Sequence, residues 1–139
     1  MKVTIDRLDQ AFHMQANNEN GNQILMDTSV QHGGSGKGFS PMQLLLAGAG
    51  GCSTIDIVSI LKKQRQDLKD IKIEITGDRN PEEVPALFKK IHMHYKVYGN
   101  IAEEKVERAI SLSLEKYCSV SLMLEKACEI SSSFEVIPV

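Results

Sequence analysis

The sequence places a nucleophilic side chain, a cysteine, at the end of a glycine-rich hydrophobic stretch. Cys52 closes the run LLLAGAGGC, and STIDIV follows it directly. If this stretch is helical, Gly48 lies one turn before Cys52 and Asp56 one turn after it, so the three share one face. Gly48, Gly50 and Gly51 each destabilise a helix by about 0.5–1 kcal/mol relative to alanine. We therefore expect either space for a substrate beside the sulfur or a close helix crossing around an inert cysteine, and spacing alone favours the inert cysteine.

Two further cysteines and a pair of histidines offer other chemistry. Cys118 follows one predicted helix and begins the next segment, where a helix N-terminus would stabilise a thiolate, although a structural junction residue fits equally well. Cys128 lies in EKACEIS without a supporting feature and is interpreted as structural. His92 and His94 have the HxH spacing of zinc ligands, but the sequence indicates no third ligand. We predict a solvated strand face there and no metal site.

The segment SPMQ predicts the start of the long helix that carries Cys52. Ser40 can cap this helix, Pro41 suits its first turn, and Gln43 can complete a capping box. The predicted helix spans residues 40–65 and is hydrophobic nearly all round in its first four turns. A chain of 139 residues has little other material to cover such a helix. A homodimer that shares the cover is therefore expected.

The remaining elements are segregated by type. Alternating hydrophobic residues predict three short strands before the long helix, with NNENGN as a turn between two of them. The elements expected after it are strands at residues 71–77 and 91–99, a helix at residues 100–117, a short helix after Cys118 and a closing strand near residues 130–136. Asn100 and Glu103 have the spacing of a capping box for the second helix. The order βββ-α-ββ-α-(α)-β predicts the α+β class in a single domain over residues 1–139.

Composition excludes several classes of partner. The net charge of -2 offers no basic surface for nucleic acid or an anionic membrane. The longest hydrophobic run contains Asp56, so we expect a buried helix and no membrane span. Three cysteines without a CxxC pair, and a charged segment after Met1 in place of a leader, predict reduced thiols in the cytoplasm. HGGSGKG departs from the phosphate-loop pattern at two positions, and no cofactor is expected.

Taken together, the two cysteine segments resemble one protein family. SPMQLLLAGAGGCSTIDIV around Cys52 and KYCSVSLML around Cys118 are similar to the OsmC/Ohr family of osmotically inducible and organic hydroperoxide resistance proteins. The similarity is greatest to the less characterised OsmC-like branch, in which a proline, a leucine run and GGC recur. The resemblance implies an OsmC-like fold, an intertwined α+β homodimer in which two long glycine-rich central helices pack back to back.

The resemblance also implies a chemistry. In peroxidase members the cysteine that corresponds to Cys52 attacks the peroxide O–O bond as a thiolate and becomes a sulfenic acid. The cysteine that corresponds to Cys118 condenses with it to a disulfide, which a small dithiol or a lipoylated protein then reduces. We therefore predict a thiol-dependent peroxidase that reduces organic hydroperoxides and could accept hydrogen peroxide. Gln43, Gly48 and Asp56 are the candidates for supporting roles.

Two departures from the peroxidase pattern leave alternatives open. Peroxidase members have a glutamate ten residues before the first cysteine, where this chain has Met42. They also use an activating arginine from the N-terminal strands, whereas Arg7 is the only arginine before Cys52 and its surroundings do not match. Gln43 supplies no carboxylate to hold an arginine, and an ionised Asp56 would disfavour a thiolate at Cys52.

The missing activating pair defines the other hypotheses. One is a redox-responsive or small-molecule-binding protein of the same fold with weak or no peroxidase activity. Another is a structural dimer with inert thiols. The sequence does not decide whether Lys37 or Arg79 takes the place of the arginine.

Overall fold

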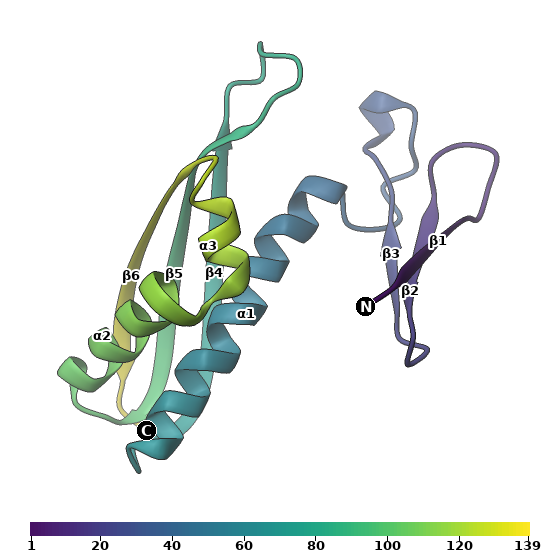
Figure 1. The fold of residues 1–139 in the computed structure, drawn as a ribbon. Coiled ribbons are helices and arrows are strands. Elements are labelled where there is room, and N and C mark those ends of the chain that lie inside the picture. The colour runs from purple at the N-terminus through teal and green to yellow at the C-terminus, as the bar shows by residue number, and fades with distance from the viewer. The chain divides into compact units, whose positions relative to one another are not determined.

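The computed structural model describes residues 1–139 and divides them into two compact units, Met1–Leu45 and Leu46–Val139 (Figure 1). The elements follow the order β1, β2, β3, α1, β4, β5, α2, α3, β6, with a 3₁₀ turn, η1 (Val30–His32), before α1 and a π-helical turn, η2 (Ser113–Tyr117), after α2. This confirms the predicted order and the α+β class. The assignment of the whole chain to one domain stays a prediction.

The first unit contains a three-stranded antiparallel meander, as predicted. Its strands pair in the order β1 (Val3–Arg7), β2 (Met14–Asn18) and β3 (Gln23–Met26). The side-chain oxygen of Asn18 organises the second turn by accepting hydrogen bonds from the N–H groups of Asn20 and Asn22, at 3.0 and 2.9 Å. Gly21 in this turn has a φ of +84°, which glycine adopts without strain.

The glycine-rich loop after β3 wraps around a buried carboxylate. Asp27 accepts hydrogen bonds from the backbone N–H groups of Thr28, Ser35 and Lys37, at 2.7, 3.2 and 3.1 Å. A Cβ atom at Gly34 would collide with the carbonyl oxygen of Thr28, so the loop requires glycine there. Backbone N–H groups that could form an anion site are therefore already used by the protein's own carboxylate.

Helix α1 (Pro41–Lys63) begins at the predicted capping box. The Ser40 N–H donates to Gln43 Oε1 at 2.9 Å, and the Gln43 N–H donates to Ser40 Oγ at 3.1 Å. The helix ends two residues before the predicted position, because Arg65 takes a φ of +56° and the chain turns into the next strand. It starts in the first unit and continues in the second.

The second unit contains a mixed sheet in the order β4 (Asp67–Arg79), β5 (Phe88–Asn100) and β6 (Glu129–Ile137). Strands β4 and β5 are antiparallel, whereas β6 runs parallel to β5. All three strands are longer than predicted. At the start of β4 a register shift between Leu68 and Asp70 interrupts the alternation on which the prediction depended.

The second predicted helix is divided into α2 (Glu103–Leu112) and the π-helical turn η2, and α3 (Ser119–Leu124) follows. The predicted capping box of Asn100 and Glu103 is wrong. Asn100 is the last residue of β5, paired with Asp67, and its side-chain amide donates to the Val139 carbonyl at 3.3 Å. Ala102 precedes α2 without a side-chain cap. Asn100 therefore belongs to strand β5 and does not cap the helix, although its spacing from Glu103 had suggested that role.

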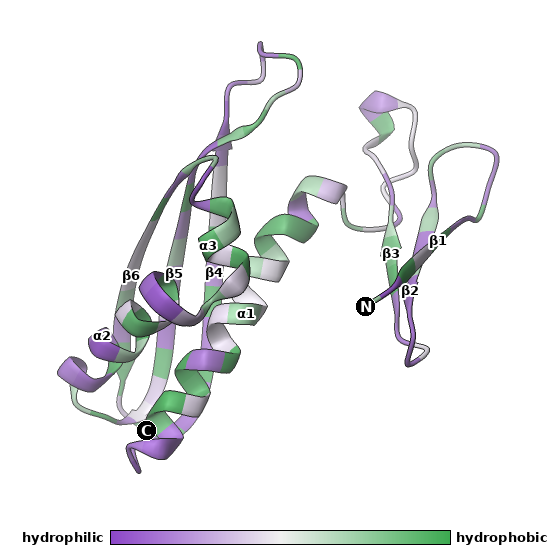
Figure 2. Ribbon diagram, viewed as in Figure 1, coloured by the Kyte–Doolittle hydropathy of each residue, from purple (hydrophilic) through white to green (hydrophobic).

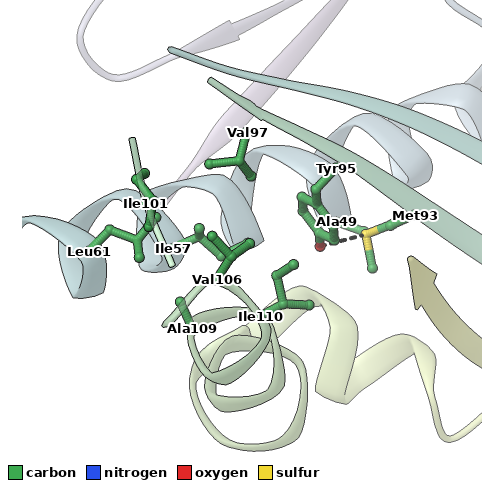
Figure 3. Close-up of a cluster of buried hydrophobic side chains, with 10 residues drawn as sticks. All are labelled: Ala49, Ile57, Leu61, Met93, Tyr95, Val97, Ile101, Val106, Ala109 and Ile110. Carbon is green, nitrogen blue, oxygen red and sulfur yellow. Dashed lines mark hydrogen bonds between the residues drawn. The ribbon is translucent and has the colours of Figure 1, made fainter. Parts of the chain in front are cut away.

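The hydrophobic core of the second unit lies between the helices and one face of its sheet (Figure 3). Buried residues come from α1, from β5 and from α2, in the order Ala49, Ile57, Leu61, Met93, Tyr95, Val97, Val106, Ala109 and Ile110. Gly50 brings α1 close to β4, because a Cβ atom at this position would collide with the Ile75 side chain. The buried residues of β5, Met93, Tyr95 and Val97, alternate along the strand. One face of β5 thus packs against the helices, as strand periodicity predicts.

Helix α1 buries only one of its faces in the chain. Ser53, Ile57 and Leu61 recur at helical spacing on the buried side, whereas Gly51 and Ile55 are exposed. Hydrophobic residues nevertheless follow the helix along most of its length (Figure 2). By length and composition alone α1 could cross a membrane, but the core helix of a globular protein passes the same test, so this is weak evidence.

Candidate functional site

Three of the side chains predicted to do chemistry meet in the second unit. The sulfur atoms of Cys52 and Cys118 and a carboxylate oxygen of Asp56 all lie within 4.8 Å of one another. Cys52 and Asp56 are one turn apart on α1, as predicted, and Cys118 is the residue that precedes α3. Cys118 is completely buried, whereas Cys52 and Asp56 are half-buried. The site therefore pairs an accessible thiol with an inaccessible one.

The π-helical turn η2 places Cys118 in this site. The Cys118 N–H donates to the Ser113 carbonyl oxygen at 2.7 Å, five residues back, which is π-helical hydrogen bonding. The hydroxyl of the same serine donates to Asp56 Oδ2 at 2.9 Å. Ser113 is completely buried. Through its backbone and its side chain it fixes two members of the site, and no motif in the sequence had indicated it.

The surroundings of Cys118 favour its protonated form. Burial raises the pKa of the Cys118 thiol, hydrogen bonds from Ser121 oppose the rise, and the neighbouring Cys52 adds to it. The Ser121 N–H lies 3.4 Å from Cys118 Sγ, and the thiol is 3.1 Å from Ser121 Oγ. At neutral pH, Cys118 is thus a neutral thiol held in a defined orientation.

A buried hydroxyl pair lies on the β5 side of α1. The Tyr95 hydroxyl donates to Ser53 Oγ at 2.9 Å, and Ser53 donates to the Gly50 carbonyl at 3.1 Å. Burial raises the pKa of Tyr95 to about 12, although its hydrogen bond with Ser53 opposes the rise. Tyr95 therefore remains a neutral donor and supports the helix turn next to Cys52. The alternation of β5 could have indicated that Tyr95 is buried, but not its partner.

The three glycines before Cys52 do not share one role. Gly50 is required by packing against Ile75, whereas a Cβ atom at Gly48 would make an ordinary contact with Val120 at 3.7 Å. A Cβ atom at Gly51 would have no neighbour within 4 Å. The close-packing interpretation thus applies to Gly50, and open space remains at Gly51. A requirement for glycine at Gly48 does not follow from its contacts.

Gln43, the remaining candidate for a supporting role, and the two arginines considered for activation have different environments. Gln43 lies in the first unit, where its side chain caps α1. Arg7 belongs to β1. Arg79, at the end of β4, packs over the Phe88 ring at 5.9 Å and donates to the Ala86 carbonyl at 3.5 Å. None of the ion pairs includes Asp56. The structure therefore assigns no cation to this carboxylate.

A pocket of about 510 Å³ opens beside Asp56, with Ser59, Lys63 and Tyr117 in its lining. It is formed by the later turns of α1 and by the end of α2 with η2. Its lining includes Asp56 but neither Cys52 nor Cys118. The pocket was not predicted, since it depends on where η2 turns the chain.

The histidine pair is hydrogen-bonded to side chains of β6. His92 lies between Ser131 and Ser133 on β6, at 2.7 and 2.8 Å, and His94 lies between Ser133 and Glu135, at 2.7 and 3.3 Å. The two imidazoles join β5 to β6 through side chains. Both histidines are half-buried, and the sequence had not indicated their partners on β6.

Comparisons with known proteins agree with this fold. The OsmC-like protein family matches residues 34–133. Protein YhfA of Escherichia coli K12 is 52% identical over 119 residues, which cover 84% of each chain. A hypothetical protein from Aquifex aeolicus VF5 has a similar crystal structure, with a TM-score of 0.80 and 35% identity over 97% of this chain and 96% of that one.

An organic hydroperoxide resistance protein, OhrB of Bacillus subtilis, shares the fold with a TM-score of 0.68 and 20% identity, over 96% of each chain. The family match includes both Cys52 and Cys118, and YhfA is similar over most of the chain. This chain belongs to the OsmC-like protein family.

Proposed function

We propose that this protein is a thiol-dependent peroxidase that reduces organic hydroperoxides with Cys52 and Cys118. The observation that carries the proposal is the meeting of these two sulfurs, one half-buried and one completely buried, at the same site. A peroxidase that works through a disulfide needs an accessible thiol for the substrate and a second thiol within reach. Among structures that share the fold, some are named organic hydroperoxide resistance proteins.

The difference in burial supports a separate role for each cysteine. Cys52 attacks the hydroperoxide as a thiolate, the O–O bond breaks, and with one proton from the solvent the products are a Cys52 sulfenic acid and an alcohol. Cys118 then gives up its proton and attacks the sulfenic sulfur as a thiolate. A Cys52–Cys118 disulfide forms, and the thiol proton leaves with the sulfenic hydroxyl as water. Ser113 supports this step because it holds the segment that carries Cys118.

Turnover requires an external dithiol. A small dithiol or a lipoylated protein would attack the disulfide, return both cysteines to thiols and leave as a disulfide itself. This cycle suits the cytoplasm, where thiols are kept reduced. Hydrogen peroxide is a second substrate to test.

A weak or absent peroxidase activity is the alternative. Met42 stands where peroxidase members have a glutamate, and Asp56, which has no ion-pair partner, lies beside the thiols. A carboxylate next to a sulfur disfavours a thiolate. On this alternative the same pair forms a disulfide slowly, and the protein acts as a redox-responsive or small-molecule-binding protein.

We propose a homodimer in which α1 of one copy packs against α1 of the other. Ile55 of α1 is 69% exposed, and Gly51, one turn earlier, has open space in place of a neighbour. A hydrophobic helix face of this kind is stable in water only when it is covered. The glycine would let a second helix approach closely. A second copy of the chain supplies the same face and therefore a matching one.

Stopped-flow oxidation of the reduced protein by cumene hydroperoxide and by hydrogen peroxide tests the proposal. We expect saturable oxidation faster than that of free cysteine. In Cys52→Ser the rate should fall by at least about a thousandfold, as for loss of a nucleophile. Cys118→Ser should react once and stop at a sulfenic acid that dimedone traps.

Cys128→Ser is the matched control, because Cys128 lies outside the site, and it should leave the kinetics unchanged. Oxidation of the wild-type protein no faster than that of free cysteine would contradict the peroxidase. A Cys52–Cys118 disulfide that forms only over hours would favour the alternative.

A further inference from the structure

The donor atoms at the thiol site have a composition that peroxide chemistry alone does not require. Two sulfurs and one carboxylate oxygen converge within 4.8 Å, from two positions one turn apart on α1 and one position before α3. Two ligands at i and i+4 on a helix with a third from another segment is an arrangement found in zinc sites. The carboxylate of Asp56 has no ion-pair partner in the structure.

We propose that the reduced protein binds Zn²⁺ through Cys52, Asp56 and Cys118. This inference does not rest on peroxidase activity, because it concerns the reduced thiols in the absence of any peroxide. Two thiolates and one carboxylate give the ion three protein ligands, and a fourth position remains for water or a small ligand, as in zinc sites that bind substrates.

The distances are compatible with a tetrahedral ion after a small adjustment. Zinc–sulfur bonds of about 2.3 Å separate two sulfurs by about 3.8 Å in a tetrahedral site. The three donor atoms lie no more than 4.8 Å apart. Two sulfurs would therefore have to close by about 1 Å at most. A sulfur and a carboxylate oxygen, which lie about 3.5 Å apart around zinc, would close by about 1.3 Å at most, and side-chain rotation on a fixed backbone can supply both changes.

Two serines already provide the outer contacts that such a site needs. The Ser113 hydroxyl donates to Asp56 Oδ2 at 2.9 Å and leaves the other carboxylate oxygen for the ion. The Ser121 N–H, at 3.4 Å from Cys118 Sγ, would donate to the bound thiolate. Donors of this kind orient ligands and offset charge on sulfur. The pocket next to Asp56 offers a route of entry.

The chemical class of the donors selects the metal. Thiolate sulfur is a poor ligand for magnesium and calcium, which prefer oxygen, and the carboxylate disfavours copper(I). Zinc accepts both donor types in one tetrahedral site. Binding converts two thiols to thiolates and releases their protons, so affinity should rise with pH.

Cobalt(II) is the probe for this site, because its bonds to thiolates give an absorption band that oxygen and nitrogen ligands do not. The untagged, reduced, metal-free protein is titrated with Co²⁺ without oxygen, and Zn²⁺ is then added. We expect a sulfur-to-cobalt band that saturates near one equivalent per chain and disappears when zinc displaces cobalt. Absence of this band, or cobalt binding without it, for example at His92 and His94, would overturn the proposal.

Variants separate a metal site from incidental binding to thiols. Asp56→Asn keeps the shape of the side chain and both sulfurs, and it should weaken zinc binding by at least about tenfold. The matched control is Asp78→Asn, which removes the same charge from an exposed position outside the site. Equal affinity in the two variants would overturn the proposal.

A second measurement uses the thiols themselves. Zinc should slow the alkylation of Cys52 by iodoacetamide at least about tenfold and leave that of Cys128 unchanged. Equal slowing at both, or at neither, would contradict the site. Since neither experiment contains peroxide, a protein that binds zinc but lacks peroxidase activity would disprove only the proposed function. Peroxidase activity in EDTA, without a cobalt band, would disprove only the zinc site.

Discussion

The two compact units differ in how much of their hydrophobic surface they bury. In Met1–Leu45 only Met26 and Asp27 are buried, and large side chains such as Ile5 and Ile24 are at least half exposed. In Leu46–Val139 the two helices α1 and α2 and strand β5 enclose a continuous core. The first unit is therefore organised mainly by backbone pairing and by the Asp27 carboxylate, and the second by hydrophobic packing.

This difference indicates which part of the chain is stable without a partner. A unit of about 45 residues with so little buried surface is close to the size at which domains need a metal, a disulfide or a partner. The exposed face of α1 adds to the surface that requires a cover. The proposed second copy would therefore stabilise the first unit and α1, whereas the core of the second unit is complete within one chain.

The largest expected effect compares two isoleucines on opposite faces of α1. Ile57 is completely buried and Ile55 is 69% exposed. Ile57→Ala should lower the free energy of unfolding by about 2–5 kcal/mol at any protein concentration, because it leaves a cavity in the core. Ile55→Ala should change that of the separate chain by less than about 0.5 kcal/mol.

Urea unfolding at several protein concentrations, with sedimentation to measure association, checks this pair. If a second copy covers α1, Ile55→Ala weakens association of the chains. The loss of stability in Ile57→Ala should instead be the same at every protein concentration. A large loss of unfolding free energy for Ile55→Ala at concentrations where the protein is monomeric would contradict this. It would show that both faces of α1 are packed within a single chain.

A smaller, local effect should appear in the first unit at low pH. Although burial acts to raise it, the pKa of Asp27 is lowered overall by backbone hydrogen bonds from Lys37, Thr28 and Ser35. A carboxyl with a lowered pKa contributes stability that is present above its unfolded value of 3.8 and is lost as the pH falls through the folded value. The loop should therefore open in acid before the second unit does.

Hydrogen exchange measures this opening at the amides of Thr28, Ser35 and Lys37. Asp27→Asn should speed their exchange by about tenfold at neutral pH, because an amide oxygen is a weaker acceptor than a carboxylate. Asp9→Asn, an aspartate of the same unit that bonds only to its own turn, is the control. Exchange in the loop that is insensitive to Asp27→Asn would contradict the role of the carboxylate.

The sequence predicted the local features well and the junctions less well. The capping box of Ser40 and Gln43, the turn at Gly21 and the alternation of β5 depend on neighbouring residues only, and all three are present. The Asn100 cap failed because the same residue also suits the end of a strand, and pairing with Asp67 decided between the two. Local spacing cannot weigh such tertiary competition.

The candidate site likewise contains residues that the sequence predicted and residues that it did not. The shared face of Cys52 and Asp56 followed from helical spacing, and the pairing with Cys118 was implied by family resemblance. Ser113 could not be predicted, because its role depends on a π-helical turn that gives no signal in the hydrophobic pattern. The contact of Tyr95 with Ser53 likewise requires the register of β5 on α1.

The smallest effect at neutral pH is expected for the contact between Tyr95 and Ser53. At alkaline pH the same tyrosine gives a test of the second unit that corresponds to the acid test of the first. Tyr95→Phe removes the hydrogen bond to Ser53 and should cost about 0.5–1.5 kcal/mol at pH 7. Tyrosine ionises at 10.0 in the unfolded chain but at about 12 in the folded one, because burial raises the pKa of Tyr95. The contribution of the tyrosine is thus present below pH 10.0 and falls as the pH rises towards 12.

Wild-type protein should lose up to about 3 kcal/mol over this range through Tyr95, and Tyr95→Phe none. The two curves of unfolding free energy against pH should therefore converge above pH 10.0 and then cross. Urea unfolding at a series of pH values measures them, with Tyr117→Phe as the exposed control. Parallel curves would contradict the burial of the phenol. Convergence would show that ionisation of a buried group in the second unit lowers stability in alkali, as protonation of Asp27 in the first unit is expected to do in acid.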